Sequence, residues 1–401
     1  MASILIIGGR GRIGSAVCRD ILQHTDAYVT ITRRAIADQP SDVLQRLSSK
    51  HSGTYSGIHS AKDVKVTNAD HRISLISLDV NDEAAVAKAI APHDIVIHCA
   101  GPFHHRPALV LQQCIALRVN YLDVSDCVPF TRRALAFHSD AQAAGITAII
   151  NTGVFPGISN SIARLCVEGF EQHTGKPPQS IRLYYGVAGS GGAGVTVMRT
   201  TFLGLQHPFK AWIKGQWQRM QPYSDRQQLE FPPPLGKTGV YWYDVPETVT
   251  LAESFPVQTV VTKFGSVPDW YNHLTWAMAR GLPKPLLHSP FVIEALSRIS
   301  YAMTQVSDRF SGTGIAMQVD ASASADPNES TPSDYRATLV HPDTAIAAGA
   351  GTGSLAQLLL AGRLSTPGVH PVEAVLPTEL FQEMMQQRQI TILHPGSPHS
   401  D

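Results

Sequence analysis

The sequence predicts an α/β protein that begins with a doubly wound parallel sheet and continues into an α/β domain with a mostly antiparallel sheet. Three observations carry this prediction. Short apolar segments alternate with segments of helical spacing through roughly the first 150 residues, which indicates βαβ units. The first apolar segment runs directly into a glycine-rich loop. After about residue 156, strand-like segments follow one another more closely.

The first strand is expected at Ser3–Ile7, because an unbroken apolar run is typical of a strand buried on both faces. Further parallel strands are expected at Tyr28–Thr32, Ile73–Leu78, Ile95–Cys99, Tyr121–Val124 and Ile146–Ile150. Helical spacing predicts helices at Ile13–Leu22, Glu83–Ile90, Pro107–Leu117 and Phe130–Ala144. Residues 35–72 are too long for one crossover, and the part Ser48–His71 is interpreted as a surface excursion.

The pattern changes from about Pro156 onward. Strands are expected at Ser180–Val187, Trp212–Met220, Val240–Val245, Thr259–Phe264, Gly314–Asp320 and Arg336–Val340. Helices are expected at Ile158–Gln172, Val197–Leu205, Trp270–Arg280, Phe291–Phe310 and Thr344–Gly362. The polar segment Ser322–Ser333 is interpreted as an exposed hairpin loop, and His394–Asp401 as a frayed tail. Such a run of strands favours a mostly antiparallel sheet.

Composition and charge argue against several classes of protein. Charged residues make up 16% of the chain, against about 25% in an average globular protein. The 32 Lys and Arg balance 32 Asp and Glu, which argues against a nucleic-acid-binding or polybasic membrane-surface protein. Five cysteines form no CxxC pair, no apolar run reaches the roughly 20 residues of a membrane helix, and the N-terminus lacks a signal-peptide pattern. We therefore expect a soluble cytoplasmic protein with no nucleic-acid partner and no integral membrane segment.

A glycine-rich loop follows the first expected strand. Gly9, Gly11 and Gly14 form the pattern GxGxxG, with Ile13 directly before the last glycine. Between a buried strand and a helix, these glycines permit a tight turn and bring backbone amides close to a pyrophosphate. The pattern predicts a Rossmann-type dinucleotide site. A strand-to-helix turn that merely needs glycine is the alternative.

The end of the second expected strand indicates which dinucleotide is bound. An NAD-binding protein usually places an acidic residue there to hold the ribose 2′-hydroxyl. This chain has Thr32, Arg33 and Arg34 instead, with no acid beside them. A guanidinium holds a 2′-phosphate through two parallel hydrogen bonds, so we expect NADP(H), with Arg12 as a further contact. Two solvated arginines at a strand end are the alternative.

Two more loops follow the carboxyl ends of expected strands, where sheets of this kind bind ligands. Asp79 and Val80 are expected beside the adenine, although a polar strand end or a helix cap explains them equally well. Ala100, Gly101 and Pro102 follow the fourth strand. Small residues there let a cofactor pass closely, and proline stiffens the turn.

Four motifs resemble the saccharopine dehydrogenase-like reductases: GGRGRIG after the first strand, HCAGPF after the fourth, YLDVSD at the fifth and NTGVFPGISN after the sixth. Tyr185–Thr201, Val257–Pro268 and Gly351–Pro371 resemble the cyanobacterial and plant branch of that family. The resemblance covers nearly the whole chain. It implies a Rossmann domain over residues 1–155, an α/β substrate and dimerisation domain over 156–342, and a C-terminal helical segment over 343–401 that returns to the Rossmann domain. A homodimer is therefore expected.

The nicotinamide is expected near the ends of the fourth and fifth strands, where reduction needs a proton donor. Asp126 matches an acidic position of the family motif YLDVSD and is the first candidate, with a helix N-cap as the alternative. His104 or its neighbour His105 would also donate a proton near neutral pH, unless it faces water. Cys99 is interpreted as a small buried residue.

Phe103 and Arg199 are the candidates for substrate binding. Arg199 follows the loop GSGGAG on an expected helix and would bind a substrate carboxylate, with a structural ion pair as the alternative. The loop itself either binds an anion through backbone amides or only makes a tight turn. No metal site is expected, because the 17 histidines form neither HExxH nor a Cys/His ligand pattern.

The sequence favours an NADPH-dependent oxidoreductase that transfers a hydride to a C=N, C=O or C=C bond of a small substrate. The resembled family includes saccharopine reductases, carboxynorspermidine dehydrogenases and homospermidine synthases, which share C=N chemistry. Imine chemistry on a polyamine or amino acid is therefore the first alternative, for which Asp123, Asp126, Asp244 and Glu247 are available as acidic residues. Saccharopine itself, with several carboxylates, would need an arginine cluster that the sequence does not show. A non-catalytic NADP-binding scaffold is the alternative of another class.

Overall fold

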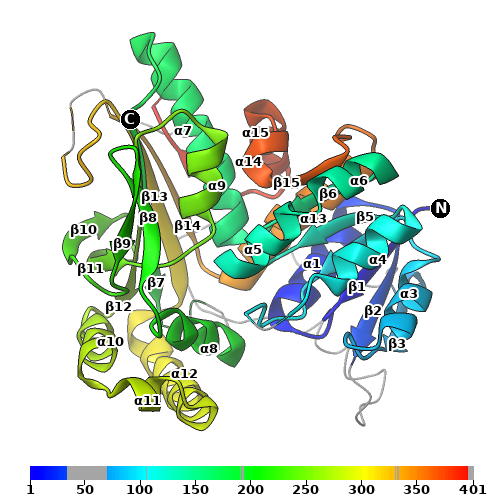
Figure 1. Ribbon diagram of the computed structural model, residues 1–401, viewed down its shortest axis with the longest axis horizontal. Coiled ribbons are helices and arrows are strands. Elements are labelled where there is room, and N and C mark those ends of the chain that lie inside the picture. Colours follow the sequence, from blue (N-terminus) through cyan, green and yellow to red (C-terminus); the bar gives the residue numbers. More distant parts are fainter. Residues whose placement is uncertain are drawn as a thin grey trace.

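The computed structural model describes residues 1–33, 70–104, 106–189, 191, 194–329, 331 and 334–395. Two seven-stranded sheets lie side by side and are connected by the helix α7 (Ser159–Thr174) (Figure 1). The expected α/β fold with a parallel first sheet is confirmed. Arg34, His105 and nearly all of the expected surface excursion lie outside the described residues.

Every neighbouring pair in the first sheet is parallel, and the strand order is β15-β6-β5-β4-β1-β2-β3. The strands are β1 (Ser3–Ile7), β2 (Tyr28–Arg33), β3 (Ile73–Ser77), β4 (Ile95–His98), β5 (Asn120–Asp123), β6 (Thr147–Ile150) and β15 (Gly368–Pro371). The central strand β1 is completely buried from Ile4 to Ile7, as its apolar run predicts. The six expected strands are confirmed. β15 was not predicted, because four residues that end in proline carry little strand signal.

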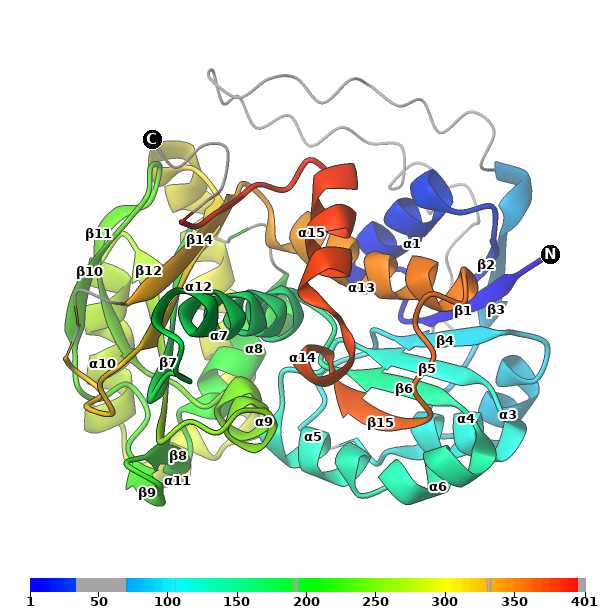
Figure 2. The same cartoon turned by 90° about the horizontal axis from the view of Figure 1, so that it is seen from above.

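Helices cover both faces of this sheet (Figure 2). One face packs against α1 (Arg12–His24) and α13 (Thr344–Leu360), and the other against α3 (Glu83–Ile90), α4 (Leu109–Leu117), α5 (Val128–Leu135) and α6 (His138–Ala144). The expectation of one helix over Phe130–Ala144 is wrong, because the chain turns at Ala136 and Phe137 between α5 and α6. Both helices contribute to the same apolar cluster, so the apolar spacing gives no sign of the turn.

The second sheet has the order β10-β11-β12-β7-β13-β14-β16. Its strands are β7 (Ser180–Ala188), β10 (Gln227–Phe231), β11 (Gly236–Trp242), β12 (Thr259–Val267), β13 (Gly314–Ser322), β14 (Tyr335–His341) and β16 (Ile392–Leu393). Only β7 and β12 pair in parallel, and the other neighbours are antiparallel. The mostly antiparallel sheet expected from the sequence is therefore confirmed.

The expected strand Trp212–Met220 is instead part of a hairpin of two short strands. β8 (Phe209–Ile213) and β9 (Gln216–Met220) pair with each other and form a separate sheet. Lys214 and Gly215 make the turn, with φ of +51° and +74°. Two successive residues with positive φ are typical of a tight hairpin turn, and the glycine at the second position was the available signal.

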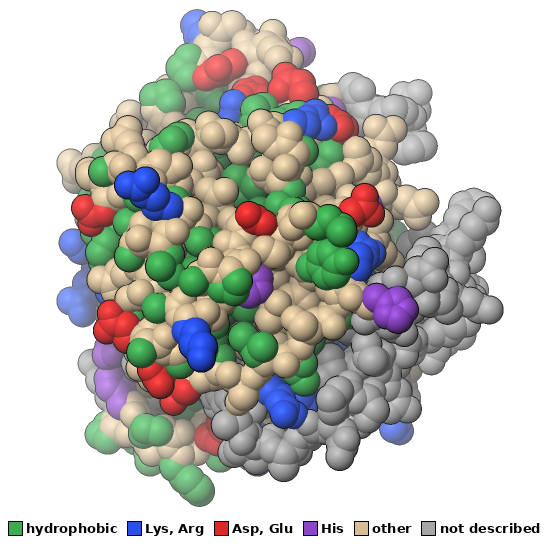
Figure 3. All heavy atoms as spheres, turned by 90° about the vertical axis from the view of Figure 1, so that its right-hand side faces the viewer, with side chains coloured by type: hydrophobic (Ala, Val, Ile, Leu, Met, Phe, Trp, Pro, Cys, Tyr) green, Lys and Arg blue, Asp and Glu red, His purple; other side chains and the backbone are tan. Residues whose placement is uncertain are grey.

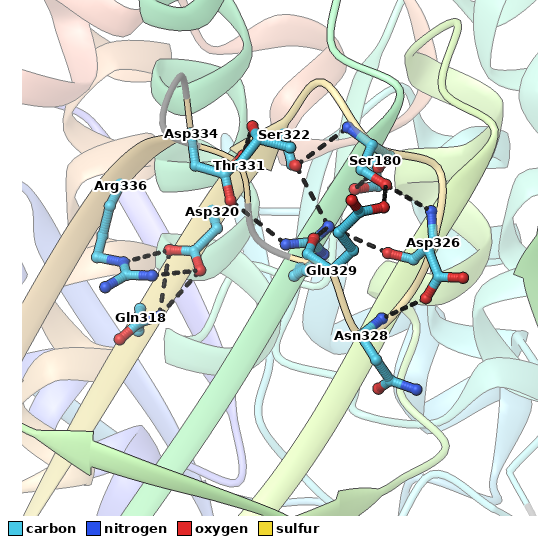
Figure 4. A network of polar contacts seen from close by, with 12 residues as sticks. Ser180, Gln318, Asp320, Ser322, Asp326, Asn328, Glu329, Thr331, Asp334 and Arg336 are labelled. Carbon is cyan, nitrogen blue, oxygen red and sulfur yellow. Dashed lines mark hydrogen bonds and ion pairs between the residues drawn. The ribbon is translucent and has the colours of Figure 1, made fainter.

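The hairpin loop between β13 and β14 is anchored by a buried arginine of β7. Arg182 is 1% exposed and donates hydrogen bonds to the hydroxyl of Ser322 and to the backbone carbonyl oxygens of Asp326 and Glu329. It also pairs with Asp334 at 3.4 Å. In Figure 4, dashed lines connect Ser322, Asp326 and Asp334 with the guanidinium that lies between them. The buried guanidinium thus satisfies carbonyl groups that the polar loop would otherwise leave unpaired.

The remaining helices are α8 (Val195–Gly204), α9 (Glu247–Ser254), α10 (Trp270–Gly281), α11 (Lys284–Leu287), α12 (Pro290–Ser311), α14 (Val372–Val375) and α15 (Thr378–Gln387). None of the described helices has the length and apolar character needed to cross a membrane. On the side of the molecule that carries the first sheet, acidic and basic side chains are interspersed among apolar ones (Figure 3). The division into three domains stays a prediction.

Candidate functional site

The glycine-rich loop joins β1 to α1 and packs tightly against neighbouring strand ends. Gly8 has φ of +84°, and a methyl group added there would lie 2.8 Å from the amide nitrogen of Ala100. At Gly9 an added methyl group would lie 2.6 Å from Cβ of Ile31, and at Gly14 it would overlap the carbonyl oxygen of Gly8. These positions accept only glycine, and the bare backbone lets a ligand approach closely.

Thr32 holds this loop in position from β2. Its Oγ1 accepts a hydrogen bond of 3.0 Å from the amide of Gly8. The amide of Gly11 donates to the carbonyl oxygen of Gly8 at 2.9 Å, and Gly11 is the N-cap of α1. Among the described residues, no side chain caps this helix. The amides of its first turn are therefore suited to an anionic ligand.

A cavity of about 600 Å³ lies in front of the loop. It is lined by Gly8, Arg10, Gly11, Thr32, Arg33, Leu78, Asp79, Val80, Asn81, Ala100 and Arg106. These residues follow or end β1, β2, β3 and β4, at the edge where open parallel sheets bind ligands. The predicted cofactor residues among them are Gly11, Thr32, Arg33, Asp79, Val80 and Ala100.

Three arginines give the cavity a positive character. Arg33 was a candidate from the sequence, whereas Arg10 and Arg106 were not. Arg10 occupies a variable position of GxGxxG, and Arg106 comes well after the fourth strand, so neither position carries a signal of its own. Among the described residues that line the cavity the one carboxylate is Asp79, whose Oδ1 accepts hydrogen bonds from the amide and the side chain of Asn81 at 2.9 and 3.0 Å. This charge balance suits a ligand with phosphate groups.

Other predicted cofactor residues lie beside the cavity without lining it. Ile13 packs against the apolar core. Arg12 lies 3.6 Å from the carboxylate of Asp343, which is the N-cap of α13. Gly101 and Pro102 form the turn after β4 and are joined by a cis peptide bond. Cofactor binding by these residues stays a prediction.

Asp126 lies in the loop between β5 and α5, where the first sheet meets α8 of the second part of the chain. Burial raises the pKa of Asp126 to about 6, and a hydrogen bond with Thr200 of α8 acts in the opposite direction. The N-cap of α5 is Cys127, so Asp126 does not occupy the capping position that was its alternative. A carboxyl group with a pKa near 6 is suited to donate a proton near neutral pH.

A second carboxyl group faces the same region. Burial raises the pKa of Asp244, which follows β11, to about 6, while the charge of Arg132 lowers it. The pKa of Cys127 is raised to about 11, chiefly by burial and further by Asp126 and Asp244. Burial is the main cause that raises the pKa of Tyr243, and the charges of Asp126 and Asp244 raise it further. Asp126 and Asp244 therefore lie within electrostatic reach of the same two side chains.

Asp123 organises the loop that carries Asp126. Its Oδ1 accepts hydrogen bonds from the amides of Ser125 and Asn151 at 2.9 and 3.0 Å. The side chain of Asn151 donates to the carbonyl oxygen of Ser125 at 2.8 Å and to the hydroxyl of Thr131 at 2.9 Å. Burial raises the pKa of Asp123 to about 6, and these amides act in the opposite direction. Asp123 is therefore a positioning residue in this loop.

Comparison with known proteins agrees with this geometry. Residues 4–149 match the family model of the saccharopine dehydrogenase NADP binding domain. The first part of the chain therefore carries an NADP-binding domain of the saccharopine dehydrogenase type. It is 25% identical to a carboxynorspermidine synthase of Vibrio cholerae over 298 residues, which cover 71% of this chain and 68% of that relative. The apo saccharopine dehydrogenase (L-Glu forming) of Saccharomyces cerevisiae shares the fold, with a TM-score of 0.62 and 15% identity over 98% of this chain and 100% of the yeast chain.

The NADP-binding domain and the oxidoreductase relatives support an NADP-dependent oxidoreductase. The cavity fits that cofactor for two reasons. The backbone leaves no room for a side chain at Gly8, Gly9 and Gly14, and three arginines line the cavity wall. NADP(H), when bound, supplies or accepts the hydride. The expected preference for NADP(H) over NAD(H) is confirmed by the family match. Membership of the cyanobacterial and plant branch stays a prediction.

The other predicted site residues lie in less distinctive surroundings. Phe103 is 3% exposed, and its ring lies 4.9 Å from the rings of both His98 and Phe130, which indicates a packing role. Arg199 forms an ion pair of 2.5 Å with Glu294 of α12, the structural alternative noted above. His104 lies in the turn after β4 and is partly buried. Substrate binding by Phe103 and Arg199, and proton donation by His104, stay predictions.

Proposed function

We propose that this oxidoreductase uses NADPH to reduce a C=N bond formed between an amine and a carbonyl compound, on a substrate that carries a further positive charge. The observation that supports the proposal is that Asp126 and Asp244 both raise the pKa of Tyr243 and of Cys127, so that two carboxyl groups act on the same side chains. Two carboxyl groups in one partly buried region favour an amine substrate, because they supply both a proton and a counter-charge. The similarity to a carboxynorspermidine synthase supports the same chemistry.

In this proposal each acidic residue has a distinct part. Asp126 would give a proton to the imine nitrogen, and the imine carbon would take the hydride that NADPH supplies when bound. Asp244 stays ionised in the presence of a cationic substrate and attracts its second amine. Asp123 and Asn151 keep the Asp126 loop in one conformation through the hydrogen bonds described above.

The test combines cofactor binding with turnover of imines. NADPH and NADH are titrated while nicotinamide fluorescence is followed, and NADPH oxidation is then measured with mixtures of diamines and aldehydes or keto acids. Asp126→Asn should lower kcat by about 100-fold or more while leaving the Kd for NADPH nearly unchanged. Asp140→Asn, which changes an exposed aspartate of α6, is the matched control and should leave both values unchanged.

Two other outcomes point to the alternatives. Turnover of ketones or enones but not of imines would place the chemistry at a C=O or C=C bond. Tight and selective NADPH binding without turnover of any of these substrates would favour a non-catalytic NADP-binding protein. An Asp126→Asn variant in which only the melting temperature changes would refute the proton-donor role.

A further inference from the structure

Two glutamates are buried where the two sheets meet. Glu247 is the first residue of α9, beside the second sheet, and is 0% exposed. Glu373 lies in α14, directly after the edge strand β15 of the first sheet, and is 2% exposed. Helix α7 contacts both α9 and α14, and α14 also contacts α9. Figure 2 shows α14 between β15 and these two helices. The pair thus spans the junction between the parts of the chain that carry the two sheets.

Successive residues of α7 hold the two carboxyl groups. The hydroxyl of Ser159 donates to Oε1 of Glu247 at 2.8 Å, and the side-chain amide of Asn160 donates to Oε2 of Glu373 at 2.9 Å. Tyr185 of β7 also donates to Oε1 of Glu247, at 2.9 Å. The second oxygen of each carboxyl group is buried and has no hydrogen-bond partner among the described residues. Ionising both groups would leave two such oxygens charged and unsatisfied, which is costly in a protein interior.

A charged group beside the pair, Arg164, does not neutralise it. Arg164 of α7 forms an ion pair with Glu168 at 2.7 Å, and its Nη1 donates to the backbone carbonyl oxygen of Glu373 rather than to the carboxylate. The groups that face the pair from α9 are the hydroxyls of Thr250 and Ser254. The group that faces the pair from β7 is the phenol of Tyr185.

The electrostatic consequence is that both groups keep their protons into the neutral range. Burial raises the pKa of Glu247 to about 7, and the neighbouring charge of Glu373 raises it further while hydrogen bonds from Ser159 and Tyr185 lower it. Burial also raises the pKa of Glu373 to about 7, against hydrogen bonds that include those from Thr250 and Asn160.

The pair is also connected to the segment that joins the sheets. Tyr185, which donates to Glu247, stacks against Phe155 with their ring centroids 5.0 Å apart. Phe155 lies between β6 and α7, in the irregular stretch Val154–Ile158, where its own backbone is not helical. Glu247 is thus linked through Tyr185 to the connection between the two sheets.

We propose that Glu247 and Glu373 together form a latch across this junction, which fastens α14 and β15 to α9 through Ser159 and Asn160 of α7 while the two carboxyl groups hold their protons, and which loosens when both are ionised. The latch is independent of the substrate and of the reaction. It makes the coupling between the two parts of the chain dependent on pH.

Hydrogen exchange of the full-length protein tests this latch. Amide exchange in residues 153–160 and 372–376 is measured at about pH 6 and about pH 8.5, roughly a unit or more on either side of the pKa values, and corrected for the intrinsic effect of pH. The corrected exchange rate should rise on the order of tenfold in the wild-type protein. It should stay low at both pH values in Glu373→Gln and Glu247→Gln, because glutamine is neutral at every pH. Glu253→Gln, which changes an exposed residue of α9, should behave like the wild type.

A wild-type protein without this rise, or glutamine variants that keep it, would overturn the latch. If one of the two glutamine variants does not fold, the other is compared with the wild-type protein. Because both folded-state pKa values lie above that of a free glutamate, the native state binds more protons than the unfolded state between roughly pH 4.5 and 7. These two groups should therefore make the protein lose stability as the pH rises through that window. A loss of stability over that window that is as large in Glu247→Gln and Glu373→Gln as in the wild-type protein would contradict the proposal.

Discussion

Arg388 at the end of α15 and Asp20 of α1 form a two-bond ion pair although they are 368 positions apart in the chain. Nε of Arg388 donates to Oδ2 of Asp20 at 2.9 Å, and Nη2 donates to Oδ1 at 2.7 Å. The two side chains are only 3% and 10% exposed. The pair therefore ties the C-terminal helices to the helix that begins at the cofactor loop.

Arg388→Met should lower the free energy of unfolding by about 3–5 kcal/mol at neutral pH, because it leaves the carboxylate of Asp20 buried without its partner. Burial raises the pKa of Asp20, and Arg388 lowers it. The loss of unfolding free energy should therefore be smaller in acid, where Asp20 is protonated and needs no cationic partner. Urea unfolding at several pH values measures this. Arg363→Met, which breaks the exposed pair with Glu383, should have little effect. Equal losses in the two variants would contradict the argument.

Gly349 brings α13 into backbone contact with α1. A methyl group there would lie 2.7 Å from the carbonyl carbon of Ala16, an atom that cannot move without shifting the helix. Gly349→Ala should therefore destabilise the protein by roughly 1–2 kcal/mol, although alanine is the better helix former. Gly281→Ala, at the end of α10 with no atom within 4 Å of the added methyl group, should be neutral or stabilising. Thermal unfolding of the two variants gives the comparison, and a stabilised Gly349→Ala variant would refute the packing argument.

Elements that depend on local pattern were predicted correctly. The strand Ser3–Ile7, the glycine loop and helix α1 follow from apolar runs, glycine spacing and helical periodicity, each of which acts over a few residues. Helix α13 was also predicted from its small residues. The sequence does not reveal that Gly349 lies on Ala16, because a helix of small residues indicates close packing without naming the partner.

Features that depend on distant contacts were missed. Strand β15 joins β6 in the first sheet only after the chain has passed through the entire second sheet. Arg10 and Arg106 line the cavity because of the conformations of the two loops that carry them. The spacing of residues in the sequence does not predict these loop conformations. Asp126 and Asp244 were both noted as acidic residues. Their common position near Tyr243 depends on how α8 and β11 pack against the first sheet.

Arg33→Ala should weaken NADPH binding far more than NADH binding. Arg33 lines the cavity at the end of β2, where the ribose 2′-phosphate of NADPH is expected, and a charged hydrogen bond of this kind contributes about 1.5–3 kcal/mol, or roughly 10- to 100-fold in Kd. Fluorescence titration with both cofactors measures the ratio. Arg280→Ala, an exposed arginine of α10, is the control. If the affinity for NADPH and the affinity for NADH fall equally, Arg33 does not bind the 2′-phosphate.

The kcat of imine reduction should fall as the pH rises through about 6, because Asp126 must be protonated to act as the acid and burial places its pKa there. Asp126→Asn should remove this dependence together with most of the activity. Asp244→Asn should instead raise the KM for a diamine-derived imine by about 10-fold and change kcat little, because Asp244 attracts the second amine without donating the proton. Its effect should disappear with an imine that has no second amine. A KM that rises equally for both substrates would show that Asp244 supports the structure of the site and does not recognise the amine.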